Sequence, residues 1–211
     1  MDFNLPKIYP ITDSAISGLS HAEQVKRLIA GGARLIQLRE KTASSRDFYR
    51  AAAEAMEIAA DSHCSILIND RVDIAYAVGV AGVHLGQDDI PASTARKILG
   101  PDAVIGLSTH TTEQAMKAVD APVDYIAFGP IFDTATKGQC AAGHGSETIK
   151  KIRRSIGSKP LVVIGGIESG QLTKLFALGA DSAAIISGIL RAPEQITEQM
   201  RLLTEMVTQK S

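Results

Sequence analysis

Eight short apolar runs recur along the chain, and a polar or Ala-rich segment follows each of them. The runs are KIYPITD (7–13), RLIQLRE (34–40), SILIND (65–70), GVHLGQ (82–87), AVIGLST (103–109), YIAFGPI (125–131), PLVVIGG (160–166) and SAAIISG (182–188). Parallel strands need a crossover of about a dozen residues, usually a helix, so this alternation favours parallel pairing. Eight such units predict an α/β fold of the closed (β/α)₈ TIM-barrel type, with a doubly wound open sheet as the alternative.

The segments between the runs show helical periodicity. Residues 51–60 (AAAEAMEIAA) and 172–178 have apolar side chains at helical spacing, and a glycine or polar residue follows each. The shortest crossover, residues 71–81, is tight for a helix but long enough. No linker interrupts the pattern, and 45% hydrophobic with 21% charged residues is ordinary for one globular core. Residues 1–211 are therefore expected to form a single catalytic domain.

The charge and hydropathy of the chain exclude several kinds of partner. A formal net charge of −1 provides no global field to hold nucleic acid or an anionic membrane surface. The sequence has no uninterrupted apolar run of about 18 residues and no N-terminal targeting pattern. We therefore expect a cytoplasmic protein that meets small anionic molecules through local cations. The residues do not indicate an oligomeric state.

Polar side chains gather where the predicted strands end. In a (β/α)₈ barrel the loops after the strands surround one mouth, which is where active sites lie. Arg39, Lys41 and Lys137 would bring three positive charges to that mouth, and a diphosphate would suit them. The other polar residues at strand ends are Asp13, Gln37, Asn69, Asp70, Gln87, Asp88, Asp89, Ser108, His110, Thr134 and Thr136.

Three of these residues suggest a metal site. Asp70 closes one predicted strand and Asp88 and Asp89 follow the next, so carboxylates from adjacent strands could share one ion. Mg²⁺ prefers oxygen ligands and often takes one or two carboxylates plus substrate phosphates, and no Cys/His cluster favours zinc. We expect Asp88 to be the loop residue or helix cap of the pair.

The ends of the last two strands suggest a phosphate cup. Gly165, Gly166 and Gly188 would let backbone N–H groups approach an anion, and many barrels bind a phosphate after strands seven and eight.

His84 lies in an apolar run and is expected to be a hydrogen-bonded interior residue, whereas His21 is expected at the periphery.

Six sequence blocks carry a family resemblance. They are QLREK (37–41), LIND (67–70), HLGQDD (84–89), GLSTH (106–110), FGPIFDTATK (128–137) and IGGI (164–167). In their order and spacing, from Tyr9 to Gly188, they resemble thiamine-phosphate synthases. The resemblance implies a Mg²⁺-dependent transferase that joins 4-amino-2-methyl-5-hydroxymethylpyrimidine diphosphate to a thiazole phosphate and releases diphosphate. That substitution needs no protein nucleophile.

The resemblance also implies which residues form each subsite. The pyrimidine diphosphate would be bound by Gln37, Leu38, Arg39, Glu40, Lys41, Asn69, Ser108 and Lys137. Of these, the residues implied in catalysis are Arg39, Lys41, Ser108 and Lys137. Asp70 and Asp89 would hold Mg²⁺. The thiazole phosphate would be bound by Thr134, Ala135, Thr136, Gly166, Ile186 and Ser187.

The sequence differs from the family pattern at one position, and three alternative functions are considered. Asp133 replaces a proline usual in the family, which puts an extra carboxylate beside the thiazole-phosphate site. A thiazole tautomerase-like barrel would use His110 for proton transfer, but Gln37, Asp70, Gln87, Asp89 and Lys137 together favour the synthase. A second rival is a non-catalytic barrel that binds thiamine precursors. The third, a barrel of the indole-glycerol-phosphate synthase type, needs an acid and base pair that the sequence does not offer.

Overall fold

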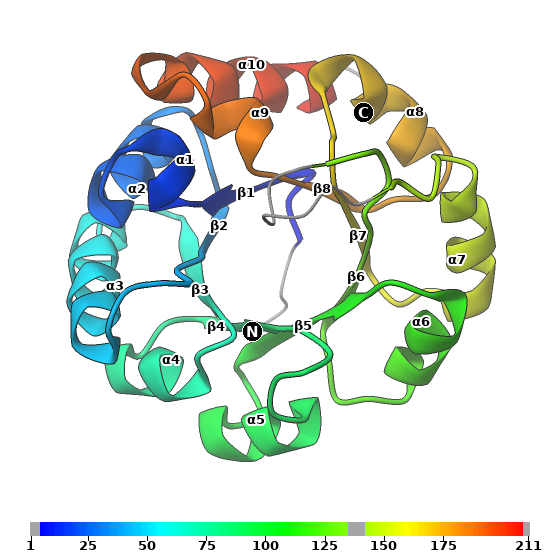
Figure 1. Cartoon of the computed structure of the whole chain (residues 1–211), viewed down its shortest axis with the longest axis horizontal. Helices are drawn as coiled ribbons and strands as arrows, with labels where there is room; N and C mark the ends of the chain where they lie inside the picture. Colours follow the sequence, from blue (N-terminus) through cyan, green and yellow to red (C-terminus); the bar gives the residue numbers. More distant parts are fainter. Residues whose placement is uncertain (1–4, 135–141, 209–211) are drawn as a thin grey trace.

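Eight parallel strands close into a barrel in the computed structural model, which describes residues 5–134 and 142–208. The strands are β1 (Ile8–Thr12), β2 (Leu35–Leu38), β3 (Ser65–Asn69), β4 (Gly82–Leu85), β5 (Val104–Thr109), β6 (Tyr125–Phe128), β7 (Leu161–Ile164) and β8 (Ser182–Ile185). Each strand pairs with its successor, and β8 returns to β1 with Tyr9 opposite Ala184 (Figure 1). The predicted (β/α)₈ fold is confirmed, and the open sheet is excluded.

Helices surround the barrel on its outside (Figure 1). The helices are α1 (Ser14–Ser17), α2 (His21–Ala30), α3 (Ser45–Ala59), α4 (Val72–Val78), α5 (Ala92–Leu99), α6 (Thr112–Val119), α7 (Thr148–Ile156), α8 (Leu172–Ala177), α9 (Ser187–Leu190) and α10 (Ile196–Thr208), with 3₁₀ turns η1 (Ser169–Gln171) and η2 (Pro193–Gln195). The helix expected over 51–60 begins earlier, because Ser44 caps it by accepting the Asp47 N–H at 3.2 Å. Among the described helices, none is long and apolar enough to cross a membrane.

The strands are buried on both faces. All four residues of β2, β4, β6 and β8 are buried. Helices cover the outer face of a parallel barrel and side chains fill its centre, so successive residues are apolar rather than alternating. Tyr9 and Tyr125 are fully buried, which places two hydroxyl groups where they need partners.

A repeated clasp ties helices to strands at the end of the barrel opposite the mouth. Asp124, just before β6, accepts the Ile105 N–H at 2.7 Å and pairs with Arg96 of α5 at 2.8 Å. Asp181, just before β8, accepts the Leu161 N–H at 2.8 Å and pairs with Arg153 of α7. Each carboxylate thus joins a helix to two neighbouring strands. This end of a barrel serves stability rather than chemistry.

Replacing one clasp should destabilise the fold. Asp124→Ala is expected to lower the free energy of unfolding by about 2 kcal/mol, because the Ile105 N–H and Arg96 both lose an acceptor. Urea unfolding measures the change, and Asp61→Ala at an exposed position is the control, with an effect below about 0.5 kcal/mol. Equal effects of the two substitutions would contradict this role of the clasp.

Candidate active site

A cavity of about 430 Å³ opens at the carboxyl ends of the strands. Its polar lining residues are Gln37, Arg39, Lys41, Asn69, Asp70, His84, Gln87, Asp88, Asp89, Ser108, His110 and Gln114. Ile11, Ile164 and Ile186 add apolar wall. The barrel therefore brings together residues that are scattered along the sequence. Within the predicted diphosphate set, Leu38 and Glu40 do not line the cavity, and Lys137 lies outside the described residues.

Two carboxyl groups lie against each other in this cavity. Asp70 follows β3 with φ of 63°, the left-handed conformation, and its N–H donates to the His84 carbonyl at 2.8 Å. Asp89 follows β4, and its Oδ2 accepts the Gly86 N–H at 2.6 Å. Burial and then the adjacent Asp70 carboxyl raise the pKa of Asp89, against the Gly86 N–H and Lys41, which lower it. Negative charge is thus concentrated at one point of the mouth.

This donor set fits Mg²⁺. It consists of oxygen atoms from two adjacent carboxylates, and a divalent cation between them would relieve their repulsion. Within 5–134 and 142–208, no group of three or more His, Cys, Asp or Glu residues converges on a metal position. Two carboxylates suit an ion such as Mg²⁺, which completes its coordination shell with water and substrate oxygens. Asp88 is exposed in the loop, and Pro91 rather than Asp88 precedes α5.

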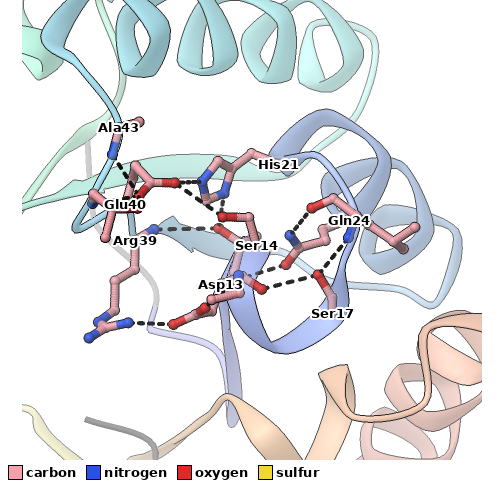
Figure 2. A network of polar contacts seen from close by, with 12 residues as sticks. Asp13, Ser14, Ser17, His21, Gln24, Arg39, Glu40 and Ala43 are labelled. Carbon is pink, nitrogen blue, oxygen red and sulfur yellow. Dashed lines mark hydrogen bonds and ion pairs between the residues drawn. The ribbon is translucent and has the colours of Figure 1, made fainter. Parts of the chain in front are cut away.

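Both described cations of the mouth are paired with carboxylates. Lys41 Nζ contacts Asp70 Oδ2, and Arg39 Nη1 contacts Asp13 Oδ2, as Figure 2 shows for the arginine. Asp13 also caps α1, since its Oδ1 accepts the Ala15 N–H at 3.0 Å. The first helix therefore helps to hold Arg39 in place beside the cavity.

A second cavity of about 340 Å³ follows β7 and β8 and shares a wall with the first. It is lined by Gly129, Pro130, Thr134, Gly165, Gly166, Ile167, Ala184, Ile185, Ser187 and Gly188, and by the shared residues His110, Ile164 and Ile186. Gly166 has φ of 61°, and a Cβ there would lie 2.5 Å from the Asp133 carbonyl oxygen. Only glycine fits this position. Of the predicted thiazole-phosphate residues, Ala135 and Thr136 lie outside the described residues.

The Asp133 carboxylate does not line the second cavity. Its Oδ1 accepts the Gly143 N–H at 2.7 Å. The extra carboxylate in place of the family proline is thus occupied by a backbone contact.

A chain of buried hydrogen bonds joins two residues of the first cavity through the barrel interior. Gln37 Nε2 donates to the Tyr9 hydroxyl at 2.8 Å, and the Tyr9 and Tyr125 hydroxyls are 3.0 Å apart. The Tyr125 hydroxyl is 2.9 Å from His84 Nδ1, and His84 Nε2 is 2.8 Å from Ser108 Oγ. His84 is interior and hydrogen-bonded, as expected. The tyrosines were missed from sequence, although a tyrosine inside a buried strand signals a partner for its hydroxyl.

Two further polar groups face the cavities. Asn69 is 7% exposed, and its Nδ2 has no hydrogen-bond partner among the described residues. A buried N–H without an acceptor is costly, so this donor suits a ligand oxygen. His110 lies on the wall between the cavities, with Nδ1 2.6 Å from the Gly129 carbonyl oxygen. The carbonyl accepts the Nδ1 proton, which leaves Nε2 as an acceptor.

Glu40 does not line the cavity. Its side chain contacts His21 and the backbone of the segment after β2 (Figure 2). Its Oε2 lies 3.3 Å from His21 Nε2, and its Oε1 accepts the Thr42 and Ala43 N–H groups at 2.8 and 3.1 Å. Burial opposes ionisation of Glu40, but these backbone and His21 contacts lower its pKa to about 2. His21 is only 4% exposed, so the expectation that it is peripheral was wrong. His21 lies beneath the segment after β2, where its Nε2 donates to the Glu40 carboxylate.

Comparisons with known proteins agree on one family. Residues 8–189 match the family described as thiamine monophosphate synthase. The thiamine-phosphate synthase of Clostridium novyi (strain NT) is 45% identical over 192 residues, 90% of this chain and 93% of that protein. The one of Chloroflexus aurantiacus is 36% identical, over 97% of this chain and 95% of its own. The solved thiamine phosphate pyrophosphorylase of Pyrococcus furiosus superposes with a TM-score of 0.86 at 32% identity, over 96% of both chains.

The depressed pKa of Glu40 predicts a pH dependence of stability. The folded pKa is about 2 and the ordinary value is 4.5, so the carboxylate stabilises the fold above about pH 4.5 and this contribution is lost as the pH falls toward 2. Glu40→Gln should lower the free energy of unfolding at neutral pH by about 3 kcal/mol, with a difference that shrinks below pH 4.5. Urea unfolding across this range tests it. The exposed Glu54→Gln is the matched control, and a Glu40→Gln offset that stays constant with pH would refute the interpretation.

Proposed function

The chain belongs to the thiamine monophosphate synthase family, and we propose that the two joined cavities are where it carries out that family's reaction. The chain is an enzyme, a transferase that makes thiamine phosphate from 4-amino-2-methyl-5-hydroxymethylpyrimidine diphosphate and a thiazole phosphate. One observation supports assigning the reaction to these cavities. Two adjacent carboxylates and two cations line one cavity, which shares a wall with a second cavity lined by glycines. The proposed assignment therefore has one cavity for each substrate.

The larger cavity takes the pyrimidine diphosphate. Arg39, Lys41 and the unpartnered Nδ2 of Asn69 donate to diphosphate oxygens, and Lys137 belongs to the same set by family resemblance. Gln37 and Ser108, held by the buried chain, contact the pyrimidine part. The side chains of Leu38 and Glu40 face elsewhere, so these two contribute through the backbone and by fixing the loop.

Asp70 and Asp89 would hold Mg²⁺ through their carboxylate oxygens. When bound, the ion supplies positive charge that offsets the charge gathering on the departing diphosphate. Lys41, already in contact with Asp70, would add a second positive charge near the departing diphosphate. To bind the diphosphate, Lys41 and Arg39 must contact its oxygens in addition to, or in place of, their present carboxylate partners Asp70 and Asp13.

The second cavity takes the thiazole phosphate. The Gly166 and Ser187 backbone, Ile186 and Thr134 surround the phosphate end, and Ala135 and Thr136 belong to this set by resemblance. His110, Ile164 and Ile186 form the shared wall, so the two substrates meet there. The C–O bond of the pyrimidine methylene breaks with its electron pair leaving on diphosphate, and the thiazole nitrogen then forms the new C–N bond. The apolar wall keeps water from capturing the cationic pyrimidine first.

The direct test is an assay of thiamine phosphate and released diphosphate, with and without Mg²⁺. Asp70→Ala and Asp89→Ala should each lower kcat/KM on the order of 100-fold, because each removes half of the carboxylate pair. Asp88→Ala, which removes the exposed neighbouring carboxylate, is the matched control, with an expected loss below about threefold. Full activity without a divalent ion, or in either variant of the pair, would remove the basis of the proposal.

A second candidate activity rests on His110, whose Nε2 is free to accept a proton because Nδ1 is bound to the Gly129 carbonyl. A tautomerase would lose its activity in His110→Ala and would need no metal. For the synthase we expect His110→Ala to lower kcat/KM less than about tenfold, since the residue only contributes to the shared wall. Steady-state kinetics distinguish the two reactions: a synthase loses more activity in Asp89→Ala, and a tautomerase loses more in His110→Ala. Tight binding of both substrates without turnover in any metal condition would indicate the non-catalytic barrel instead.

A further inference from the structure

The buried chain from Gln37 to Ser108 has a direction. Gln37 Nε2 is a donor, so the Tyr9 hydroxyl is the acceptor of that bond. Tyr9 is 1% exposed, and its other hydrogen bond is to the Tyr125 hydroxyl, so the Tyr9 proton points at Tyr125. A buried hydroxyl proton needs an acceptor, and among the described residues the Tyr125 hydroxyl, 3.0 Å away, provides it.

The chain of hydrogen bonds continues from Tyr125 to the mouth of the barrel. The Tyr125 hydroxyl accepts from Tyr9, so its own proton points at His84 Nδ1, 2.9 Å away. A neutral imidazole whose Nδ1 accepts carries its proton on Nε2. His84 Nε2 then donates to Ser108 Oγ at 2.8 Å. The Ser108 hydroxyl proton is left to point into the cavity that this residue lines.

The neighbouring residues fix the position of the Tyr125 ring inside the barrel. Gly106 faces it in the strand register, and a Cβ at Gly106 would lie 2.0 Å from Cζ of Tyr125 and 2.3 Å from its hydroxyl. The His84 ring stacks on the Tyr125 ring, with centroids 5.6 Å apart and planes 18° from parallel. Burial raises the pKa of both tyrosines, so both hydroxyls keep their protons. Space, stacking and protonation all hold the hydroxyl against His84.

We propose that Tyr125 is a positioning residue of the active site: it keeps the His84 proton on Nε2 and so makes Ser108 a hydrogen-bond donor to the ligand. The ligand atom that meets Ser108 must then be an acceptor. The direction of the chain follows from the protein alone, whereas its effect on turnover rests on the proposed function. Tyr125 is fully buried and lines neither cavity, so it acts through His84.

The first experiment reads the tautomer of His84 in the free protein. Long-range ¹H–¹⁵N spectra at about pH 8, where an ordinary histidine is neutral, distinguish the protonated from the bare ring nitrogen, and His84→Gln identifies the signals. We expect the proton on Nε2 in the wild type and in Tyr9→Phe, because Tyr125 still donates there. In Tyr125→Phe the proton should shift toward Nδ1, so that Ser108 donates to Nε2. A wild-type His84 with its proton on Nδ1 would overturn the proposal, even if Tyr125→Phe fails to fold.

The second experiment is a double-mutant cycle in the thiamine phosphate assay. Tyr125→Phe should lower kcat/KM for the pyrimidine diphosphate about tenfold in the wild type but less than about twofold in a Ser108→Ala background. The KM for the thiazole phosphate should not change, and the exposed Tyr76→Phe is the matched control without effect. Equal losses in both backgrounds, or a parallel rise of both KM values, would show a merely structural role. If the wild type makes no thiamine phosphate, the proposed function fails while the tautomer still decides the direction.

Discussion

The pairing of β8 with β1 is the constraint on which the rest of this molecule depends. Closure turns a linear series of strand ends into a ring, so residues as distant as Gln37 and Ser108 line one cavity. An open sheet with the same strands would leave the ends of β1 and β8 far apart. The second cavity depends on it too, because its walls come from β7 and β8 and from the segment after β6.

Charge at the mouth is balanced rather than uniformly positive. Lys41 and Arg39 rest on Asp70 and Asp13, and Asp70 lies against Asp89. Arg39 and Asp13 are the more buried pair, and their contact limits the cost of desolvating both charges. Under the proposed function, a chain of net charge −1 would bind the diphosphate together with a divalent cation, because the charge of the cation offsets most of the charge of the anion.

The sequence predicts the residues that line the first cavity where a motif lies at a strand end, but it does not predict which way each side chain points. Asn69 ends β3, Asp70 follows it and Asp89 follows β4, so the closed barrel brings all three to the mouth. Glu40 belongs to the same motif as Lys41, yet it turns the other way, toward His21. Arg39 and Lys41 line the cavity and Glu40 between them does not, whereas the adjacent Asn69 and Asp70 both line it. In these loops the packed neighbours decide which side chains face the cavity.

The sequence by itself determined the eight-unit fold, the family and the positions of the carboxylates and cations, because periodicity and motif spacing are local properties of the chain. Tertiary structure alone decided that Asp70 and Asp89 touch, that the Asp133 carboxylate is taken up by the Gly143 N–H, and that Tyr9 and Tyr125 link Gln37 to Ser108. These contacts join residues from different strands and loops. Their distances depend on closure of the barrel and on side-chain packing inside it, which no local pattern encodes.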